Sequence, residues 1–215
     1  MTKKRVGIYG SSFDPITNVH LWTASTVASR EDLDLVIFLP CSSGRRADTK
    51  KMKTEDEHRV KMVKMAIKDN PKFEFSGYEL DVDYGIATTY LTMQYFQEVY
   101  PDADLFFIMG ADLLNDLPSW RQGEELIKNF NFIVMAREGY DMLKIIATNP
   151  VLRNNQRRFH LMDKGLAMEI SSTYIRDEIA MGGEPRYLLP EPCYNYIKEH
   201  KLYTDKHKNR TGMVR

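Results

Sequence analysis

The stretch Val6-Gly-Ile-Tyr-Gly-Ser-Ser-Phe-Asp-Pro-Ile-Thr-Asn-Val-His20 decides how the rest of the chain can be interpreted. A short apolar run ends at Gly10-Ser11-Ser12, and His20 falls where a helix should begin. We therefore predict a strand that runs directly into a turn and a helix. Such a turn gathers backbone N–H groups, a helix N-terminus and an imidazole, which suits the phosphates of a nucleotide. An ordinary strand–turn–helix connection with an incidental histidine would give the same pattern.

The composition is typical of one globular domain. The chain has 215 residues, enough for a sizeable core, and 43% of them are hydrophobic. Its 30 basic residues balance 30 acidic ones, so nothing attracts the whole molecule to nucleic acid or to an acidic membrane, and any anion site must be local. We expect a domain over residues 1–204, followed by a flexible basic tail at residues 205–215.

The cysteines and the N-terminus bear on the expected compartment. Cys41 and Cys193 are far apart and lack metal-ligand spacing, so neither a disulfide framework nor a cysteine metal site is expected. Only four or five apolar positions follow the first five residues, too few for a signal peptide or a membrane span. We therefore expect a cytoplasmic protein that binds neither membranes nor nucleic acid.

Apolar runs alternate with amphipathic segments along most of the chain. Strands are predicted at residues 6–9, 35–39, 73–75, 105–109, 132–135 and 159–162. Helices are predicted at residues 18–29, 54–67 (opening on a capping box at 54–57), 86–99, 119–128, 140–148, 172–181 and 191–200. Continuous apolar strands between helices indicate an α/β fold. We expect a Rossmann-like doubly wound parallel sheet flanked by helices, in a single domain with a small C-terminal helical part.

Several residues follow the predicted strands and define where a ligand should bind. In doubly wound sheets, ligands bind beyond the carboxyl ends of the strands. Gly10, Pro40, Gly110 and Arg137 all follow strands in this way, so one cleft could collect them.

A second hydroxyl-rich segment lies near the end of the chain. Glu169-Ile-Ser-Ser-Thr-Tyr-Ile-Arg176 places three hydroxyls at a helix start, with an arginine one turn further on. Either Ser171 or Ser172 can cap that helix. The free N–H groups, the hydroxyls and Arg176 could clamp phosphate oxygens, although a plain cap with a solvated arginine is the alternative.

Taken together, residues 10–20 and 170–176 resemble the His/Thr-x-Gly-His and Ser-x-Thr-x-x-Arg motifs of the nucleotidyltransferase superfamily related to class I tRNA synthetases. Within it, residues 5–203 are most similar to the nicotinate or nicotinamide mononucleotide adenylyltransferases. Further stretches match that family at residues 110–120, 132–141 and 186–200. The chain departs from the pattern where Val19 replaces the motif glycine, where Ser11 replaces a common glycine, and where residues 41–51 replace the bacterial Pro-Pro-His-Lys loop.

The resemblance implies a reaction in which the phosphate of a pyridine mononucleotide attacks the α-phosphorus of ATP in line. Pyrophosphate leaves, and deamido-NAD or NAD forms without a covalent enzyme intermediate. Catalysis would consist mostly of positioning and of neutralising negative charge. Mg²⁺ would bind mainly through the ATP phosphates, so no dedicated set of protein metal ligands is expected.

The resemblance also implies which residues would bind ATP. His20 would contact the phosphates and, when protonated, stabilise the transition state, with Thr17 and Arg176 as further catalytic residues. Asp112 would accept a hydrogen bond from a ribose hydroxyl, or would cap a helix. The full ATP-binding set would be Ser12, Phe13, His20, Gly110, Asp112, Ser172, Thr173 and Arg176.

The mononucleotide would lie beside ATP. Trp120 would stack on the pyridine ring, or would instead be a core tryptophan of an amphipathic helix. Thr89 would seat the carboxyl or amide group, and Arg137 would hold a phosphate or ribose. Lys50 is the best candidate within a basic loop that is either a solvated loop or an electrostatic lid. The full set would be Ser11, Lys50, Thr89, Trp120 and Arg137.

The role of Asp14, the exact function and the assembly state stay open at this point. Asp14 would be a turn residue or would touch the Mg²⁺ shell through water, and Trp22 is expected in the core. Three alternative functions remain. The protein could be an adenylyltransferase with another acceptor such as pantetheine phosphate, a cytidylyltransferase, or a non-catalytic nucleotide sensor. The chain could also form a homo-oligomer.

Overall fold

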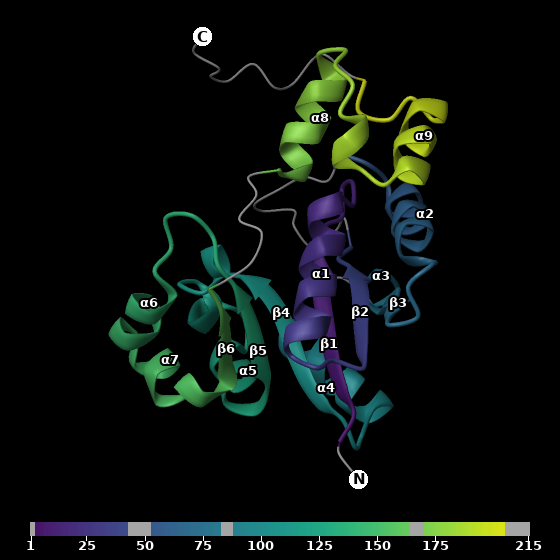
Figure 1. Ribbon diagram of the computed structural model, residues 1–215. Coiled ribbons are helices and arrows are strands. Elements are labelled where there is room, and N and C mark those ends of the chain that lie inside the picture. Colours follow the sequence, from purple (N-terminus) through teal and green to yellow (C-terminus); the bar gives the residue numbers. More distant parts are fainter. Residues whose placement is uncertain (1–2, 43–52, 83–87, 164–169, 205–215) are drawn as a thin grey trace.

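The apolar runs of the sequence pair into one parallel sheet. The computed structural model describes residues 3–42, 53–82, 88–163 and 170–204. The strands are β1 (Arg5–Ser11), β2 (Leu35–Pro40), β3 (Phe73–Phe75), β4 (Asp104–Gly110), β5 (Asn131–Met135) and β6 (Phe159–Met162). Their order is β3-β2-β1-β4-β5-β6, and every pairing is parallel (Figure 1). The direction of winding therefore reverses between β1 and β4, where open sheets of this type bind ligands.

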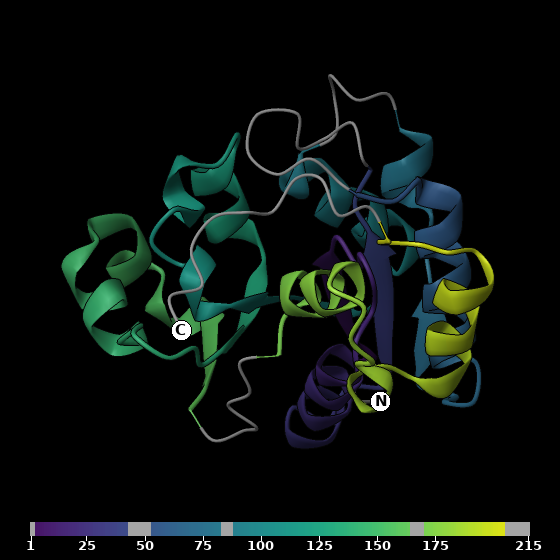
Figure 2. The ribbon, with the colours of Figure 1, turned by 90° about the horizontal axis from the view of Figure 1, so that it is seen from above.

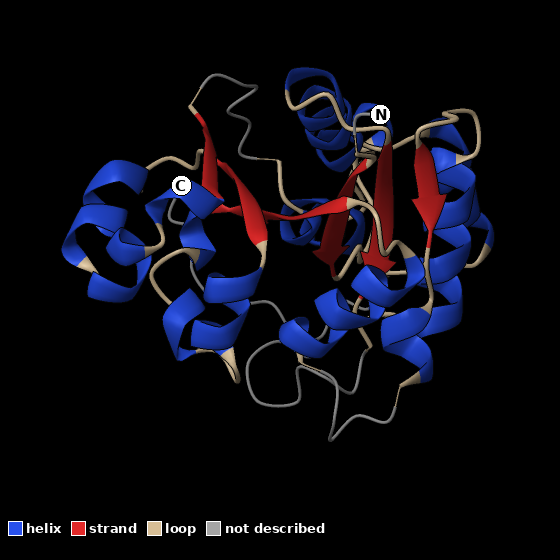
Figure 3. Ribbon diagram, turned by 90° about the horizontal axis from the view of Figure 1, so that it is seen from below, coloured by secondary structure: helices blue, strands red, loops and turns tan. Residues whose placement is uncertain are grey.

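Helices cover both faces of the sheet (Figure 3). Those whose side chains pack on one face are α4 (Thr89–Val99), α5 (Gly123–Asn129), α6 (Met142–Thr148) and α7 (Pro150–Asn154). Those packed on the other face are α1 (Asn18–Arg30), α2 (Asp56–Ile67), α8 (Ser172–Ala180) and α9 (Glu191–Glu199). Alternation along β4 explains why its sequence is apolar throughout, since Phe106 and Ile108 join one core while Leu105, Phe107 and Met109 join the other.

The C-terminal helices lie beyond the carboxyl ends of the central strands. Figure 1 shows α8 and α9 at the end of the molecule toward which β4 points, and Figure 2 looks down on α8 there. Ile175 of α8 is completely buried in the same core as Phe13 and Ile16 from the β1–α1 connection. The two segments that the sequence singled out therefore share one hydrophobic core. Among the described residues, no helix is both long and apolar enough to cross a membrane.

Most of the expected elements are confirmed, with shifts of one or two residues at the strand ends. Two short helices were not expected, α3 (Tyr78–Asp81) and α7. The helix expected at residues 140–148 begins at Met142, because the Asp141 side chain caps it by accepting a hydrogen bond from the Lys144 N–H. Trp22 was expected in the core, and this was wrong: it is 39% exposed on α1. The proposed tail at residues 205–215 lies outside the described residues.

The capping box expected at residues 54–57 is absent. The N-cap of α2 is Glu55, and it makes no side-chain capping bond. Thr54 is buried instead, and its side chain lies close enough to Tyr203 to lower the pKa of that phenol. A tertiary contact has therefore replaced the local cap.

The helix expected to start at Ser119 begins four residues later, at Gly123. A short 3₁₀ turn at residues 117–119 comes first, and Gln122 then adopts a left-handed conformation with φ of 60°. The chain folds back so tightly that a Cβ atom at Gly123 would lie 2.2 Å from the Leu117 carbonyl oxygen. Trp120 therefore lies in a loop that Gly123 closes, and not on a helix.

Replacing Gly123 with alanine should destabilise the protein strongly, because backbone must move to admit the methyl group. We expect Gly123→Ala to lower the free energy of unfolding by about 1–3 kcal/mol, the usual cost of overpacking. Gly77→Ala is the matched control, since its Cβ would meet side-chain atoms no closer than 3.6 Å. Denaturant unfolding of both variants checks this, and equal losses at the two positions would contradict it.

Candidate active site

The connection between β1 and α1 is a turn that fixes His20 through its own backbone. Thr17 is the N-cap of α1, and a reciprocal capping box joins it to His20. The Thr17 N–H donates to His20 Nδ1 over 3.0 Å, and the Thr17 hydroxyl lies 2.8 Å from the same nitrogen. Thr17 is completely buried, and through these bonds it positions His20.

This geometry also assigns the proton of His20. A backbone N–H can only donate, so Nδ1 must accept, and the neutral ring carries its proton on Nε2. Burial against the protein, and secondarily the positive charge of Arg137, lower the pKa of His20 from 6.5 to about 4. In the free protein the ring is therefore neutral near pH 7, with Nε2–H as a donor.

The start of α8 contacts this turn directly, as the sequence predicted. The Ser172 hydroxyl donates to the Pro15 carbonyl oxygen over 2.8 Å, and the Arg176 guanidinium donates to the Asp14 carbonyl oxygen over 2.6 Å. Arg176 also donates to the Thr173 hydroxyl over 3.1 Å. Ser171, one of the two expected caps, is the N-cap of α8. The Nε atom of Arg176 is buried and has no protein partner in the described part of the chain.

Asp14 joins two further segments to the same turn. Its carboxylate is only 2% exposed, and it accepts hydrogen bonds from the Lys53 N–H and the Tyr203 hydroxyl, both over 2.8 Å. Burial and the Asp14 charge raise the pKa of Tyr203 well above its usual value, so the phenol stays protonated as the donor. Asp14 is thus a buried turn residue whose two carboxylate oxygens both accept hydrogen bonds from the protein.

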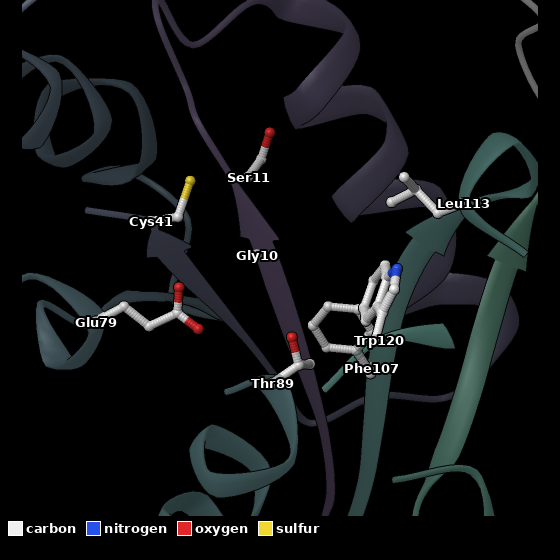
Figure 4. A pocket seen from close by; sticks show the side chains of 8 residues that line it. All are labelled: Gly10, Ser11, Cys41, Glu79, Thr89, Phe107, Leu113 and Trp120. Carbon is white, nitrogen blue, oxygen red and sulfur yellow. The ribbon is translucent and has the colours of Figure 1, made fainter. Parts of the chain in front are cut away.

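A pocket opens at the carboxyl ends of β1 and β2. Its volume is about 290 Å³. Trp120 and Phe107 lie together on one side of it, with their rings in an edge-to-face arrangement 6.3 Å apart, and Cys41 and Glu79 lie on the other side (Figure 4). The lining residues are Gly10, Ser11, Cys41, Glu79, Thr89, Phe107, Leu113 and Trp120. Three of the residues expected to hold a mononucleotide thus share one pocket: Ser11, Thr89 and Trp120.

Glu79 is a pocket residue that the sequence did not suggest. Its side chain is almost buried on the short helix α3, and it accepts a hydrogen bond from the Thr92 hydroxyl of α4 over 2.9 Å. No local pattern marks a four-residue helix of this kind, so only the packing of α3 against α4 reveals the carboxylate.

Gly110, Asp112 and Arg137 form a second edge of the site, next to His20. A Cβ atom at Gly110 would lie 2.3 Å from the Asp112 carboxylate, so only glycine lets this carboxylate fold back over the strand end. The Arg137 Nε lies 3.7 Å from Asp112, and both side chains are about half exposed. Asp112 lies within a 3₁₀ turn that Gly110 precedes, so the alternative of Asp112 as a helix cap is wrong.

The remaining expected site residue is Lys50, which lies outside the described residues. Ser12 and Phe13 occupy the turn, and within the described ranges neither N–H has a hydrogen-bond partner. Across those same ranges, no group of three or more His, Cys, Asp or Glu side chains could hold a metal ion.

Comparison with known proteins agrees with these motifs. The model of the Cytidylyltransferase-like family matches residues 8–178. A probable nicotinate-nucleotide adenylyltransferase of Streptococcus pyogenes serotype M3 is 37% identical over 94% of this chain and 89% of its own. The protein of the same name from Clostridium tetani is 34% identical over 93% of this chain and 99% of its own.

Solved structures share the fold. Nicotinic acid mononucleotide adenylyltransferase of Plasmodium falciparum, complexed with NaAD, superposes with a TM-score of 0.74 at 22% identity, over 93% of this chain and 97% of that one. A putative nicotinate-nucleotide adenylyltransferase from Vibrio parahaemolyticus gives a TM-score of 0.64 at 22% identity, over 91% and 99%. The chain therefore belongs to the cytidylyltransferase-like family and, within it, to the nicotinate-nucleotide adenylyltransferases.

Proposed function

We propose that this protein transfers the adenylyl group of ATP to nicotinate mononucleotide, releasing pyrophosphate and forming deamido-NAD. The observation that carries the proposal is the contact of α8 with the β1–α1 turn, beside a pocket that holds Trp120. At that contact lie a neutral imidazole donor, an arginine and N–H groups that have no partner among the described residues. A triphosphate needs such donors. The names of the relatives favour the nicotinate form of the acceptor.

The chemistry asks the protein mainly to position two anionic substrates. The phosphate of the mononucleotide is the nucleophile, so no side chain needs to form a covalent bond. As pyrophosphate leaves, negative charge spreads over the triphosphate. This charge would be stabilised by the N–H groups of Ser12 and Phe13, by the start of α8 and by the Nε2–H of His20. Arg176, whose Nε has no partner within the described ranges, would bind the same oxygens.

Magnesium would accompany ATP into this site and shield its phosphate charge. Both carboxylate oxygens of Asp14 are engaged by protein donors, so Asp14 is a poor direct ligand. We propose that the nucleotide phosphates and water supply the ligands of the ion.

The direct test supplies purified protein with Mg²⁺, ATP and one acceptor at a time. Nicotinate mononucleotide should yield pyrophosphate and deamido-NAD at a higher kcat/KM than nicotinamide mononucleotide yields NAD. Turnover with pantetheine phosphate or with CTP, but with neither pyridine mononucleotide, would instead establish another activity of the same superfamily. ATP binding without turnover on any acceptor would indicate a nucleotide sensor.

Substitutions at His20 separate its hydrogen bond from its charge. His20→Ala removes the Nε2–H donor and should lower kcat by about a hundredfold or more, as loss of one charge-stabilising donor does. His20→Gln keeps an amide donor that cannot titrate, and we expect only about a tenfold loss from it, consistent with one hydrogen bond of reduced quality. Thermal unfolding of both variants is the control for folding. Equal losses of kcat in the two variants would contradict a donor role for the neutral ring.

Binding of ATP should raise the pKa of His20, because the triphosphate charge favours the imidazolium ion. In the free protein, NMR titration should find this pKa near 4, as burial and Arg137 dictate. If the bound form has the higher pKa, ATP binding takes up a proton, so affinity rises as pH falls between the two pKa values. His20→Gln should lose this extra slope and keep that of ATP itself. A free pKa near 6.5 would refute the tautomer and the environment assigned here.

A further inference from the structure

The largest completely buried side chain includes a charged group: Arg59 of α2, with 0% exposure. Burying a guanidinium is costly unless its donors are paired. Arg59 donates to the carbonyl oxygens of Ser12 and, over 2.8 Å, Cys41, and it forms an ion pair with Asp56. Its Nε atom has no partner among the described residues. Two of the three acceptors are backbone carbonyls at strand ends, which points to a role in shaping the backbone there.

The first of these carbonyls controls a donor of the phosphate turn. In a trans peptide, C=O and N–H point in opposite directions, so fixing the Ser12 carbonyl also fixes the Phe13 N–H. Phe13 has φ of 45°, a left-handed conformation that a bulky residue keeps only when its surroundings hold it there. Its ring is fully buried, 5.1 Å from the His20 ring. Arg59 therefore holds the Phe13 N–H pointing away from its own guanidinium.

The second carbonyl belongs to the wall of the pocket. Cys41 directly follows β2, lines the pocket and donates its N–H to the Ser11 carbonyl over 3.0 Å. The guanidinium of Arg59 therefore bridges the residues that follow β1 and β2, Ser12 and Cys41. One side chain therefore fixes both the peptide group that carries the Phe13 N–H and the position of a pocket residue.

We propose that Arg59 is a positioning residue for the reaction. The proposal rests on the proposed function. Arg59 orients the Phe13 N–H toward the ATP phosphates and itself contacts neither substrate. A lysine at this position keeps the positive charge but cannot fork between two carbonyls, so it separates geometry from charge.

The test measures ATP binding, which does not depend on the identity of the acceptor. Calorimetry with Mg²⁺ and a non-hydrolysable ATP analogue should show at least a tenfold weaker affinity for Arg59→Lys than for the unaltered chain. The matched control is Ile67→Ala, which truncates another buried side chain further along α2 and should leave the affinity unchanged within about twofold. If both variants lose equal affinity at equal loss of melting temperature, the role of Arg59 is merely structural.

The amide signal of Phe13 provides a readout that general destabilisation would not move. In the unaltered chain, the ATP analogue should shift this ¹⁵N–¹H signal strongly, and in Arg59→Lys the shift should largely vanish while signals of β5 stay the same. Asp56→Asn is a second variant in case Arg59→Lys fails to fold, because it keeps the guanidinium and removes only its carboxylate partner. It should weaken analogue binding a few-fold, and an unchanged Phe13 shift in every folded variant would overturn the proposal.

Discussion

The whole site depends on two hydrogen bonds that α8 makes to the backbone of the β1–α1 turn, one from Ser172 and one from Arg176. Carbonyl groups of a tight turn face inward and must find donors when they are buried. Here the donors come from a helix far along the chain, so no N–H group of the turn itself is used to satisfy these two carbonyls. These contacts therefore occupy carbonyl acceptors of the turn on its buried side, and they use none of its N–H donors.

Buried charges beneath the turn hold it in this state. Asp14 and Arg59 are both almost inaccessible to solvent, and each bonds to segments from different parts of the chain. Asp14 joins the turn to Lys53 and Tyr203, while Arg59 joins it to Cys41. A buried charge tolerates little displacement of its partners, because a lost hydrogen bond leaves that charge unsolvated. Rigidity at the turn thus follows from groups that need never touch a substrate.

The sequence was sufficient to predict the sheet, and the resemblance of residues 10–20 and 170–176 to a known family implied that both would bind one nucleotide. Continuous apolar strands and helical spacing are local signals, and the motif residues lie at strand and helix ends whose positions follow from the fold. What it did not indicate depends on contacts between distant residues. Thr54 lies beside Tyr203 and caps no helix, and Trp22 is exposed. The hydrogen-bond partners of Arg59 and Glu79 are visible only in the three-dimensional structure. The neutral state of His20 likewise required the orientation of the Thr17 N–H, which no spacing encodes.

The distance along the chain between the two halves of the site has a consequence for its biosynthesis. Pro15 and Ser172 are 157 positions apart, so a ribosome must deliver most of the polypeptide before the hydroxyl can reach that carbonyl. An incomplete chain that stops before α8 could pair all of its strands and still lack the contacts of Ser172 and Arg176 with the turn. The proposed nucleotide site is therefore completed late in synthesis. A bound nucleotide would stabilise the full-length chain relative to any chain that ends before α8.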